Sequence, residues 1–275
     1  MGWEKKIRLF VKYKQWIYEL AVRDLKLRYR KPFLGFLWML IIPLCSAIIY
    51  KLLFSDFFQI TTGRYPYFIY LLTSLLPWAY FSSSLQGSVK SILESKDMIS
   101  QVAFPKYLLP VSAVFANLLN FLPTILILIC FLAAYGIKIA TLIICLPLVI
   151  LIHTCLIVGL SLLVSSLQVI CRDVEYIVQV VITVLFYLTP SVYTLDELIG
   201  KGTPLFIKIY MYNPLVGILN LYRITFISGY SSDLPPEVNY SNTIINPILW
   251  AVAVLFIGYK VFKKTEGKFY DYINV

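Results

Sequence analysis

The side chains best suited to binding an anion lie in a basic run that ends abruptly against apolar sequence. The run consists of Arg23, Lys26, Arg28, Arg30 and Lys31, and no charged residue follows it before Lys51. Because Lys and Arg are costly to place in hydrocarbon and collect on cytoplasmic flanks, this boundary predicts a cytoplasmic membrane surface. Asp24 and Arg28 are four residues apart and could form a local ion pair. Alternatively, Arg28 faces an anionic lipid headgroup.

Groups that would make the chain an enzyme are missing from the sequence. Gly200-Lys201 and Gly267-Lys268 lack both the following Ser or Thr and the earlier glycine of a phosphate-binding loop. His153 is the only histidine and lies in the middle of an apolar run, where a packed neutral ring is favoured over a proton relay. We therefore predict no catalytic residue and no ATP hydrolysis by this chain.

Metal binding and ion-coupled transport are also disfavoured. The five cysteines form no CxxC pair, and Cys45, Cys130, Cys145 and Cys155 lie inside apolar runs, so we expect buried thiols and no metal site. No apolar run carries Asp or Glu at its centre, which a proton- or sodium-coupled carrier usually needs.

Aromatic side chains are abundant, with 21 Tyr, 18 Phe and 5 Trp. Near the ends of spans they are expected to form interfacial belts. Others lie in mid-span or in a later hairpin, where rings could stack on sugars while Tyr hydroxyls bind sugar hydroxyls. These are Phe36, Trp38, Tyr80, Phe81, Phe186, Tyr187, Tyr210 and Tyr212. For any single one of them, an interfacial belt or ordinary helix packing is the favoured explanation.

The elements that position these residues are membrane-spanning helices. With 60% hydrophobic and 14% charged residues in 275, the chain is too apolar for a soluble globule. We predict an all-α integral membrane protein with six spans, at about 33–54, 67–88, 107–135, 139–168, 176–194 and 241–260, within a transmembrane region of 33–263. Residues 1–32 form an amphipathic helix in the membrane interface and 264–275 a cytoplasmic tail.

Residues 197–228 are predicted to form a re-entrant hairpin. Their uncharged piece, 209–222, has 14 residues and is broken by Asn213-Pro214, so it is too short to cross the membrane. Most of the 24 Lys and Arg then lie on one side together with both termini, which the positive-inside rule makes the cytoplasm. The net charge of +10 thus reflects loops beside anionic lipid, and nucleic acid is not an expected partner.

Six segments resemble the membrane subunit of type-2 ABC exporters of lipid-linked polysaccharides, the permeases for O-antigen, capsule and teichoic acid. They are RDLKLRYRKPFLGFLWMLIIP (23–43), LLPWAYFSSSL (75–85), VAFPKYLLP (102–110), CRDVEYIVQ (171–179), FYLTPSVY (186–193) and YNPLVGI (212–218). The resemblance runs over nearly the whole chain and keeps the order of the motifs.

This resemblance implies a homodimer in the cytoplasmic (inner) membrane, with two copies of a separate ATPase subunit that holds Mg-ATP. It implies a coupling helix at about 90–99, and with it contacts to the ATPase through Lys90, Ile92, Leu93, Glu94, Lys96, Asp97 and Met98, joined by Arg172 and Asp173. An outer gate is implied at 197–228, with Tyr210, Tyr212, Asn213 and Pro214.

On this basis the substrate is a lipid-linked glycan, most readily O-antigen. Its headgroup would be attracted by Arg23, Arg28, Arg30 and Lys31, and the glycan would pass the aromatic residues Phe36, Trp38, Tyr80, Phe81, Phe186 and Tyr187. The alternatives are capsule or teichoic acid export by the same mechanism, export of a drug or other small amphiphile, a membrane-embedded enzyme acting on lipid-linked sugars, and a non-transporting scaffold.

Overall fold

The computed structural model is mainly helical in the part of the chain that it describes. This part comprises residues 3–29, 35–57, 59, 65–101, 104–235, 238–239 and 241–269, with 3–12, 27–29, 36, 39, 196–197, 201 and 204 described by their backbone alone. The predicted sites Arg30 and Lys31, and the side chains of Arg28 and Phe36, lie outside the described residues.

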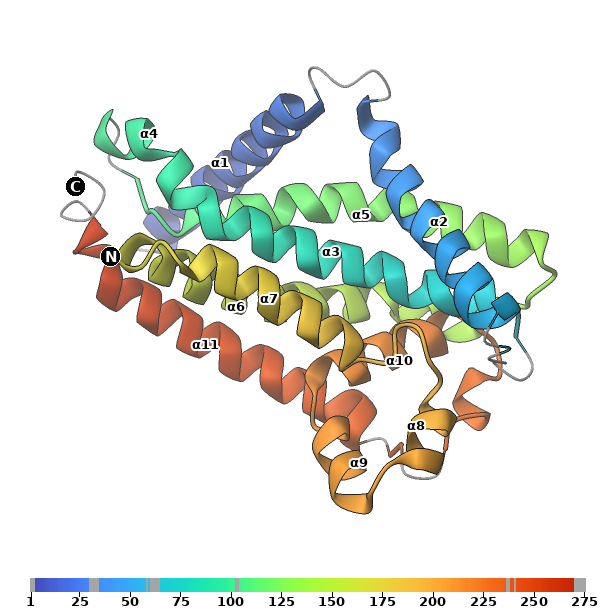
Figure 1. Ribbon diagram of the computed structural model, residues 1–275. Coiled ribbons are helices and arrows are strands. Elements are labelled where there is room, and N and C mark those ends of the chain that lie inside the picture. The colour runs from blue at the N-terminus through green and yellow to red at the C-terminus, as the bar shows by residue number, and fades with distance from the viewer. Residues whose placement is uncertain are drawn as a thin grey trace.

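The α-helices are α1 (Trp3–Tyr29), α2 (Trp38–Tyr50), α3 (Tyr67–Glu94), α4 (Lys96–Gln101), α5 (Leu108–Ala134), α6 (Leu146–Ile170), α7 (Val174–Tyr187), α8 (Leu195–Lys201), α9 (Pro204–Met211), α10 (Pro214–Phe226) and α11 (Asn246–Glu266). Short 3₁₀ and π segments are η1 (Gly35–Leu37), η2 (Lys51–Phe57), η3 (Thr141–Cys145), η4 (Tyr230–Ser232) and η5 (Ser241–Ile245). Helix α1 begins and α11 ends at the end of the bundle that carries α4, whereas α8 and α9 lie at the other end (Figure 1).

Five helical segments in the described part of the chain are long and apolar enough to cross a membrane. They are Leu40–Phe57, Tyr67–Glu94, Leu108–Ala134, Thr141–Ile170 and Ser241–Glu266. Each corresponds to one of the predicted spans, and the all-α membrane fold is confirmed. The remaining predicted span, 176–194, differs from the structure.

Its helix, α7, has only 14 residues. At 1.5 Å per residue it measures about 21 Å, against about 30 Å for the hydrocarbon core. Pro190 explains the early end, because proline lacks an N–H group and disfavours helical backbone in the residue before it. The apolar sequence continues past Tyr187, but as a non-helical and mostly buried segment, 188–194, which leads into α8.

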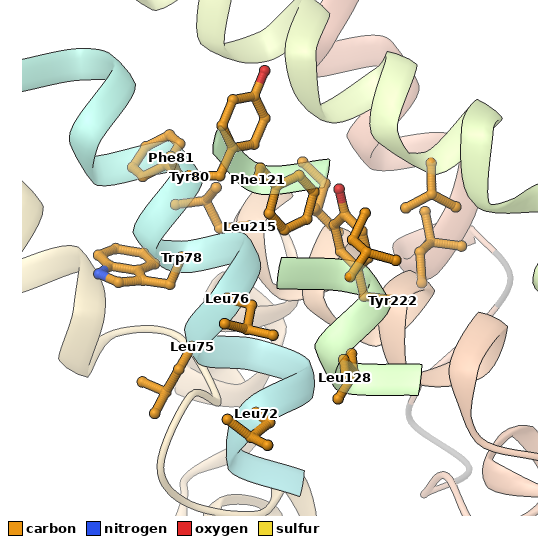
Figure 2. Close-up of a cluster of buried hydrophobic side chains, with 14 of the residues drawn as sticks. Leu72, Leu75, Leu76, Trp78, Tyr80, Phe81, Phe121, Leu128, Leu215 and Tyr222 are labelled. Carbon is orange, nitrogen blue, oxygen red and sulfur yellow. The ribbon is translucent and has the colours of Figure 1, made fainter. Parts of the chain in front are cut away.

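Helix α3 lies at the centre of the bundle and packs against α2, α5, α6, α7 and α10. Its rings contact partners on opposite sides. The Tyr80 ring stacks on Phe121 of α5 with centroids 5.0 Å apart, and the Trp78 ring lies 5.4 Å from Phe186 of α7. Figure 2 shows Tyr80, Phe121 and Tyr222 gathered on one side of α3 and Trp78 on the other. The main apolar core therefore surrounds α3.

Helices α6 and α11 form the most extensive helix pair of the bundle. They approach closely because glycines face each other where they cross. A Cβ atom added to Gly159 would lie 2.5 Å from the backbone nitrogen of Leu255, and one added to Gly258 would collide with the carbonyl oxygen of Gly159. Small residues at such crossings are typical of membrane helix packing.

A second apolar cluster fills the α4 end of the bundle. Leu20 of α1, Ile92, Ile99 of α4 and Leu108 meet the rings of Phe262 and Phe269 there. Phe269 is fully buried, although residues 264–275 are predicted to be a cytoplasmic tail. The start of that tail is therefore part of the packed core, and α11 itself continues to Glu266.

Candidate functional site

The predicted coupling region lies where α3 ends and α4 begins. Helix α3 stops at Glu94, Ser95 leaves helical geometry, and α4 starts at Lys96. Ile92 is fully buried in the cluster beneath, whereas Glu94, Lys96 and Asp97 are exposed. Leu93 and Met98 are half-buried. The corner therefore presents charges to the outside on an apolar base, a surface suited to docking.

An ion pair joins this corner to the start of α7. The Lys90 ammonium lies 2.6 Å from Oε1 of Glu175, and both side chains are partly exposed. Arg172 and Asp173, the other predicted coupling residues, are exposed in the turn just before α7, and Gln168 donates to the Arg172 carbonyl. The two regions predicted to contact the ATPase, the α3–α4 corner and the turn before α7, are thus joined by an ion pair.

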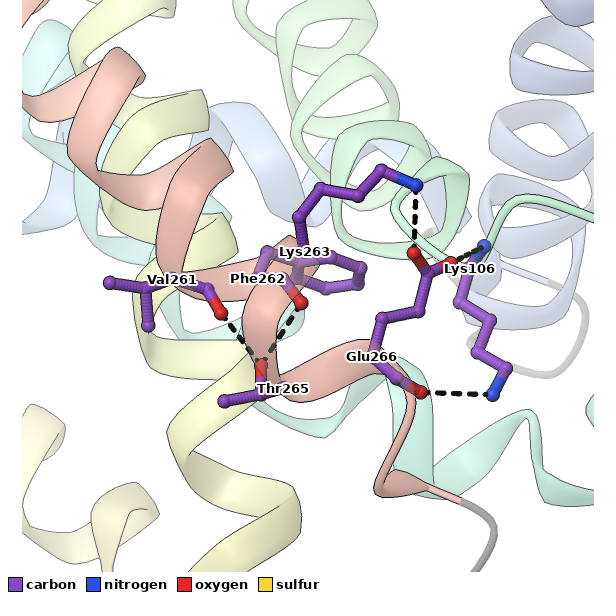
Figure 3. Close-up of polar contacts among 6 residues, drawn as sticks. All are labelled: Lys106, Val261, Phe262, Lys263, Thr265 and Glu266. Carbon is purple, nitrogen blue, oxygen red and sulfur yellow. Dashed lines mark hydrogen bonds and ion pairs between the residues drawn. The ribbon is translucent and has the colours of Figure 1, made fainter.

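Glu266, at the end of α11, forms polar contacts with the segment between α4 and α5 (Figure 3). Its carboxylate accepts from the Lys263 ammonium at 2.9 Å and from the backbone N–H of Lys106 at 3.3 Å, and its carbonyl accepts from the Lys106 ammonium at 3.3 Å. Burial lowers the pKa of Lys106, and the Glu266 charge opposes part of this shift. The segment between α4 and α5 is thereby tied to the chain's C-terminal region.

Arg23 borders a cleft of about 380 Å³ between α1, α3 and α5. Its guanidinium donates to Oδ1 of Asp24 at 3.1 Å and to the Met98 sulfur at 3.7 Å. Asp24 thus pairs with Arg23; the predicted pair of Asp24 with Arg28 involves a side chain outside the described residues. Because Asp24 and Glu94 also line this cleft, its charge is not positive. Arg23 by itself is therefore poorly placed to attract a phosphate.

The predicted passage aromatics separate into buried and exposed groups. Tyr80 and Phe81 are 3% and 1% exposed and pack against His153, Phe121 and Trp78, and Phe186 is also buried. Tyr80 and Phe81 belong to the central helix α3 and Phe186 to α7, and in this conformation of the single chain none of the three lies on an open surface. Trp38 and Tyr187 are 44% and 60% exposed. They remain on the surface of α2 and α7.

His153 is packed in the bundle interior. Its ring lies between those of Tyr80 and Tyr222, and Nδ1 is 3.3 Å from the Tyr222 hydroxyl. No Asp or Glu occurs among the buried residues of the described part. The packed histidine favoured by the sequence is what the structure contains.

The predicted gate hairpin consists of α8, α9 and α10. Asn213 caps α10 by accepting from Leu215 N–H at 3.0 Å, and Pro214 takes the first helical position. The hydroxyls of Tyr210 and Tyr193 are 3.0 Å apart, and Tyr210 is buried whereas Tyr212 is 57% exposed. Of the predicted gate residues, Tyr210 is thus packed in the interior, whereas Tyr212 lies on the protein surface.

Side chains from α3, from α10 and from the N-cap of α10 hold the segment 188–194 through its carbonyl groups. Ser74 of α3 donates to Ser191 at 2.8 Å, Tyr70 to Tyr193 at 2.9 Å, and Tyr67 to Val192. Asn213 donates to Leu188 at 3.2 Å, and Arg223 of α10 donates to Pro190. Of these donors, sequence reasoning singled out only Asn213, as a residue of the outer gate. The only signal for the others was a set of polar residues at three- or four-residue spacing in apolar helices.

Comparison with known proteins identifies the family. Residues 15–227 match the family described as ABC-2 type transporter. The chain belongs to the ABC-2 type transporter family. With this assignment and its apolar helices, it is a multi-pass membrane protein.

Two curated relatives of this ABC-2 protein are similar over almost their whole length. The chain is 30% identical over 251 residues to the O-antigen export system permease protein RfbA of Myxococcus xanthus, covering 91% of this chain and 94% of the relative. It is 30% identical over 250 residues to the protein of the same name from Klebsiella pneumoniae, covering 90% of each.

Proposed function

We propose that this chain is the permease subunit of an ATP-driven exporter that carries a lipid-linked polysaccharide, O-antigen in the first instance, to the outer side of the cytoplasmic membrane. The observation that carries the proposal is its similarity to O-antigen export permeases over about nine-tenths of both chains. The described residues include no buried carboxylate that could bind a coupling ion. Energy then has to come from a separate ATPase subunit.

The α4 end of the bundle is the cytoplasmic side in this proposal. Here the exposed charges of Glu94, Lys96 and Asp97 meet the ATPase. ATP-driven closure pushes the α3–α4 corner, and the Lys90–Glu175 ion pair passes this movement to α7. The helices then shift as rigid bodies, the usual response of packed elements.

The passage forms between two copies of the chain. Segment 188–194 is non-helical, and backbone of this kind at membrane depth must be shielded from lipid by protein. Yet Tyr187 and Leu188 are 60% and 44% exposed in the single chain. A second copy packed against α7 provides the shield, which supports a homodimer and places Trp38 and Tyr187 beside the glycan.

The lipid headgroup arrives at the start of the first span. Because Arg23 is paired with Asp24, attraction of the phosphates falls mainly to Arg28, Arg30 and Lys31. Helices α8, α9 and α10 close the outer mouth after the glycan has passed. No step of this route uses catalysis by the chain itself.

The test is reconstitution with a candidate ATPase subunit, in vesicles containing a lipid-linked glycan. We expect the glycan to stimulate ATP hydrolysis and to become accessible to an added lectin on the far side. A catalytically inactive ATPase is the control and should abolish both. Stimulation by small amphiphiles in place of glycan would instead assign drug export, and glycan movement by the chain alone would refute the proposal.

A further inference from the structure

A permanently charged side chain lies in the interior at the hairpin end of the bundle. Arg223, near the end of α10, is 0% exposed. Its guanidinium carbon lies 3.7 Å from the centroid of the Tyr70 ring, and Nη2 donates to the carbonyl of Pro190. No carboxylate in the described part of the chain forms an ion pair with it.

These two contacts connect three parts of the chain. Tyr70 belongs to the central helix α3, Arg223 to α10, and Pro190 to the non-helical segment between α7 and the hairpin. The neighbouring carbonyls of Ser191, Val192 and Tyr193 accept only from α3. Arg223 is thus the contact by which α10 holds the middle of the segment against α3.

The guanidinium is incompletely satisfied in this position. Its Nε and Nη1 have no hydrogen-bond partner in the described structure, and neither has the side-chain amide of Asn220, one turn earlier. A buried charge without full pairing is costly, so this arrangement is readily exchanged for one in which the donors meet water or hydroxyl groups. A contact that is both specific and easily released is suited to a gate.

We propose that Arg223 is a positioning residue of the outer gate: through Pro190 and the Tyr70 ring it holds segment 188–194 in the sealed position, and its release accompanies opening. The proposal rests on the exporter function proposed above. It acts within one subunit and requires no contact between Arg223 and the ATPase. Its ligand in the open state is hydroxylated, either water or the passing glycan.

The experiment uses the complete complex with its ATPase in vesicles loaded with a small hydrophilic fluorophore. Arg223→Met keeps an unbranched, flexible side chain, although a shorter one, and removes the charge and the donors. We expect it to raise fluorophore release in the absence of ATP several-fold, and to lower the amount of glycan exported per ATP. Arg223→Lys keeps the cation over Tyr70 but loses the planar guanidinium, so its fluorophore release should lie between those of the wild type and Arg223→Met.

Two further comparisons separate gating from folding. Lys208→Met removes another positive charge of the hairpin, from an exposed position on α9, and should leave release at the wild-type rate. If Arg223→Met does not assemble, the pair Tyr70→Phe and Tyr70→Leu decides. Both lose the hydroxyl that donates to Tyr193, but only Leu loses the ring under Arg223, so only Leu should leak strongly.

The proposal is wrong if Arg223→Met changes only thermal stability while surviving complexes release fluorophore and export glycan as wild type does, or if the two Tyr70 variants leak equally. Failure of the proposed function has a different signature. In that case wild-type complexes would export no glycan, whereas the difference in resting release between wild type and Arg223→Met would still be measured.

Discussion

Phe269 belongs to the predicted cytoplasmic tail, but its side chain is part of the packed core. Its ring is fully buried, lies at 87° to the ring of Phe262 with centroids 5.4 Å apart, and has the Lys106 ammonium 5.4 Å from its centroid. The surrounding cluster joins α1, α4, α5 and α11. A single aromatic residue thus helps to fix the base on which the coupling corner stands.

We therefore expect Phe269→Ala to lower the free energy of unfolding by about 3–5 kcal/mol, because it removes a large ring from a packed interior. The measurement is the thermal midpoint of the purified protein in detergent. Phe256→Ala is the matched control, since that ring lies on the same end of the chain but is 59% exposed. Equal losses in the two variants would contradict the assigned packing.

In the proposed mechanism, the Lys90–Glu175 pair transmits movement from α3 to α7 and contributes little to stability. Both side chains are substantially exposed, at 46% and 35%, and water and salt screen ion pairs of this kind. Lys90→Glu would instead place like charges opposite each other between α3 and α7. We expect the thermal midpoint to change little and the glycan exported per ATP to fall several-fold.

The double variant Lys90→Glu with Glu175→Lys restores opposite charges in reversed order. It should regain a large part of the lost coupling, measured in the same vesicles. A double variant as defective as Lys90→Glu alone would show that Lys90 contacts the ATPase directly, and would remove the ion pair from the coupling route.

At the scale of elements, the bilayer makes long helices easy to predict from the sequence, whereas irregular segments are difficult to predict. Spans at 67–88 and 107–135 correspond to α3 and α5 because a membrane requires about twenty apolar residues per crossing. Hydropathy alone cannot show where a helix stops inside an apolar run. It extended α7 past Pro190, where the chain leaves helical geometry.

The sequence also does not show which face of a helix is buried by neighbouring helices. Tyr80 and Phe81 were predicted to line a passage, but α3 is surrounded by other helices on all sides. The burial of Arg223 is likewise invisible in the sequence, because the positive-inside rule counts charges on each side of the membrane and does not measure burial. In both cases tertiary packing, which periodicity does not encode, decided the environment.

The crossing of α6 and α11 yields a prediction at this scale. Gly159→Ala would place a methyl group against the backbone of Leu255, where no flexible side chain can yield. We expect a loss of about 1–3 kcal/mol, the usual cost of overpacking, seen as a lower thermal midpoint and poorer recovery from the membrane. Gly267→Ala, whose new Cβ would meet nothing within 4 Å, should behave as wild type.

For the whole molecule, the question is which apolar surface faces a second copy and which faces lipid. Helices α7 and α11 both carry large exposed apolar side chains, among them Val180 at 61% and Leu249 at 62%. Exposure alone does not distinguish them. Leu188 does, because it begins the non-helical segment directly after α7 and is 44% exposed, and non-helical backbone at membrane depth needs a protein cover. In the proposed homodimer, the α7 face is therefore the interface between copies.

In a two-fold symmetric dimer, a residue near the axis meets its own counterpart. Val180→Cys, in a variant without the native cysteines, should therefore form an intermolecular disulfide on mild oxidation in native membranes, seen as a dimer on a non-reducing gel. Leu249→Cys is the matched control, similarly exposed but on α11, and should stay monomeric because lipid covers it. Cross-linking through Leu249 and not Val180 would move the interface to α11 and place the glycan passage away from Trp38 and Tyr187.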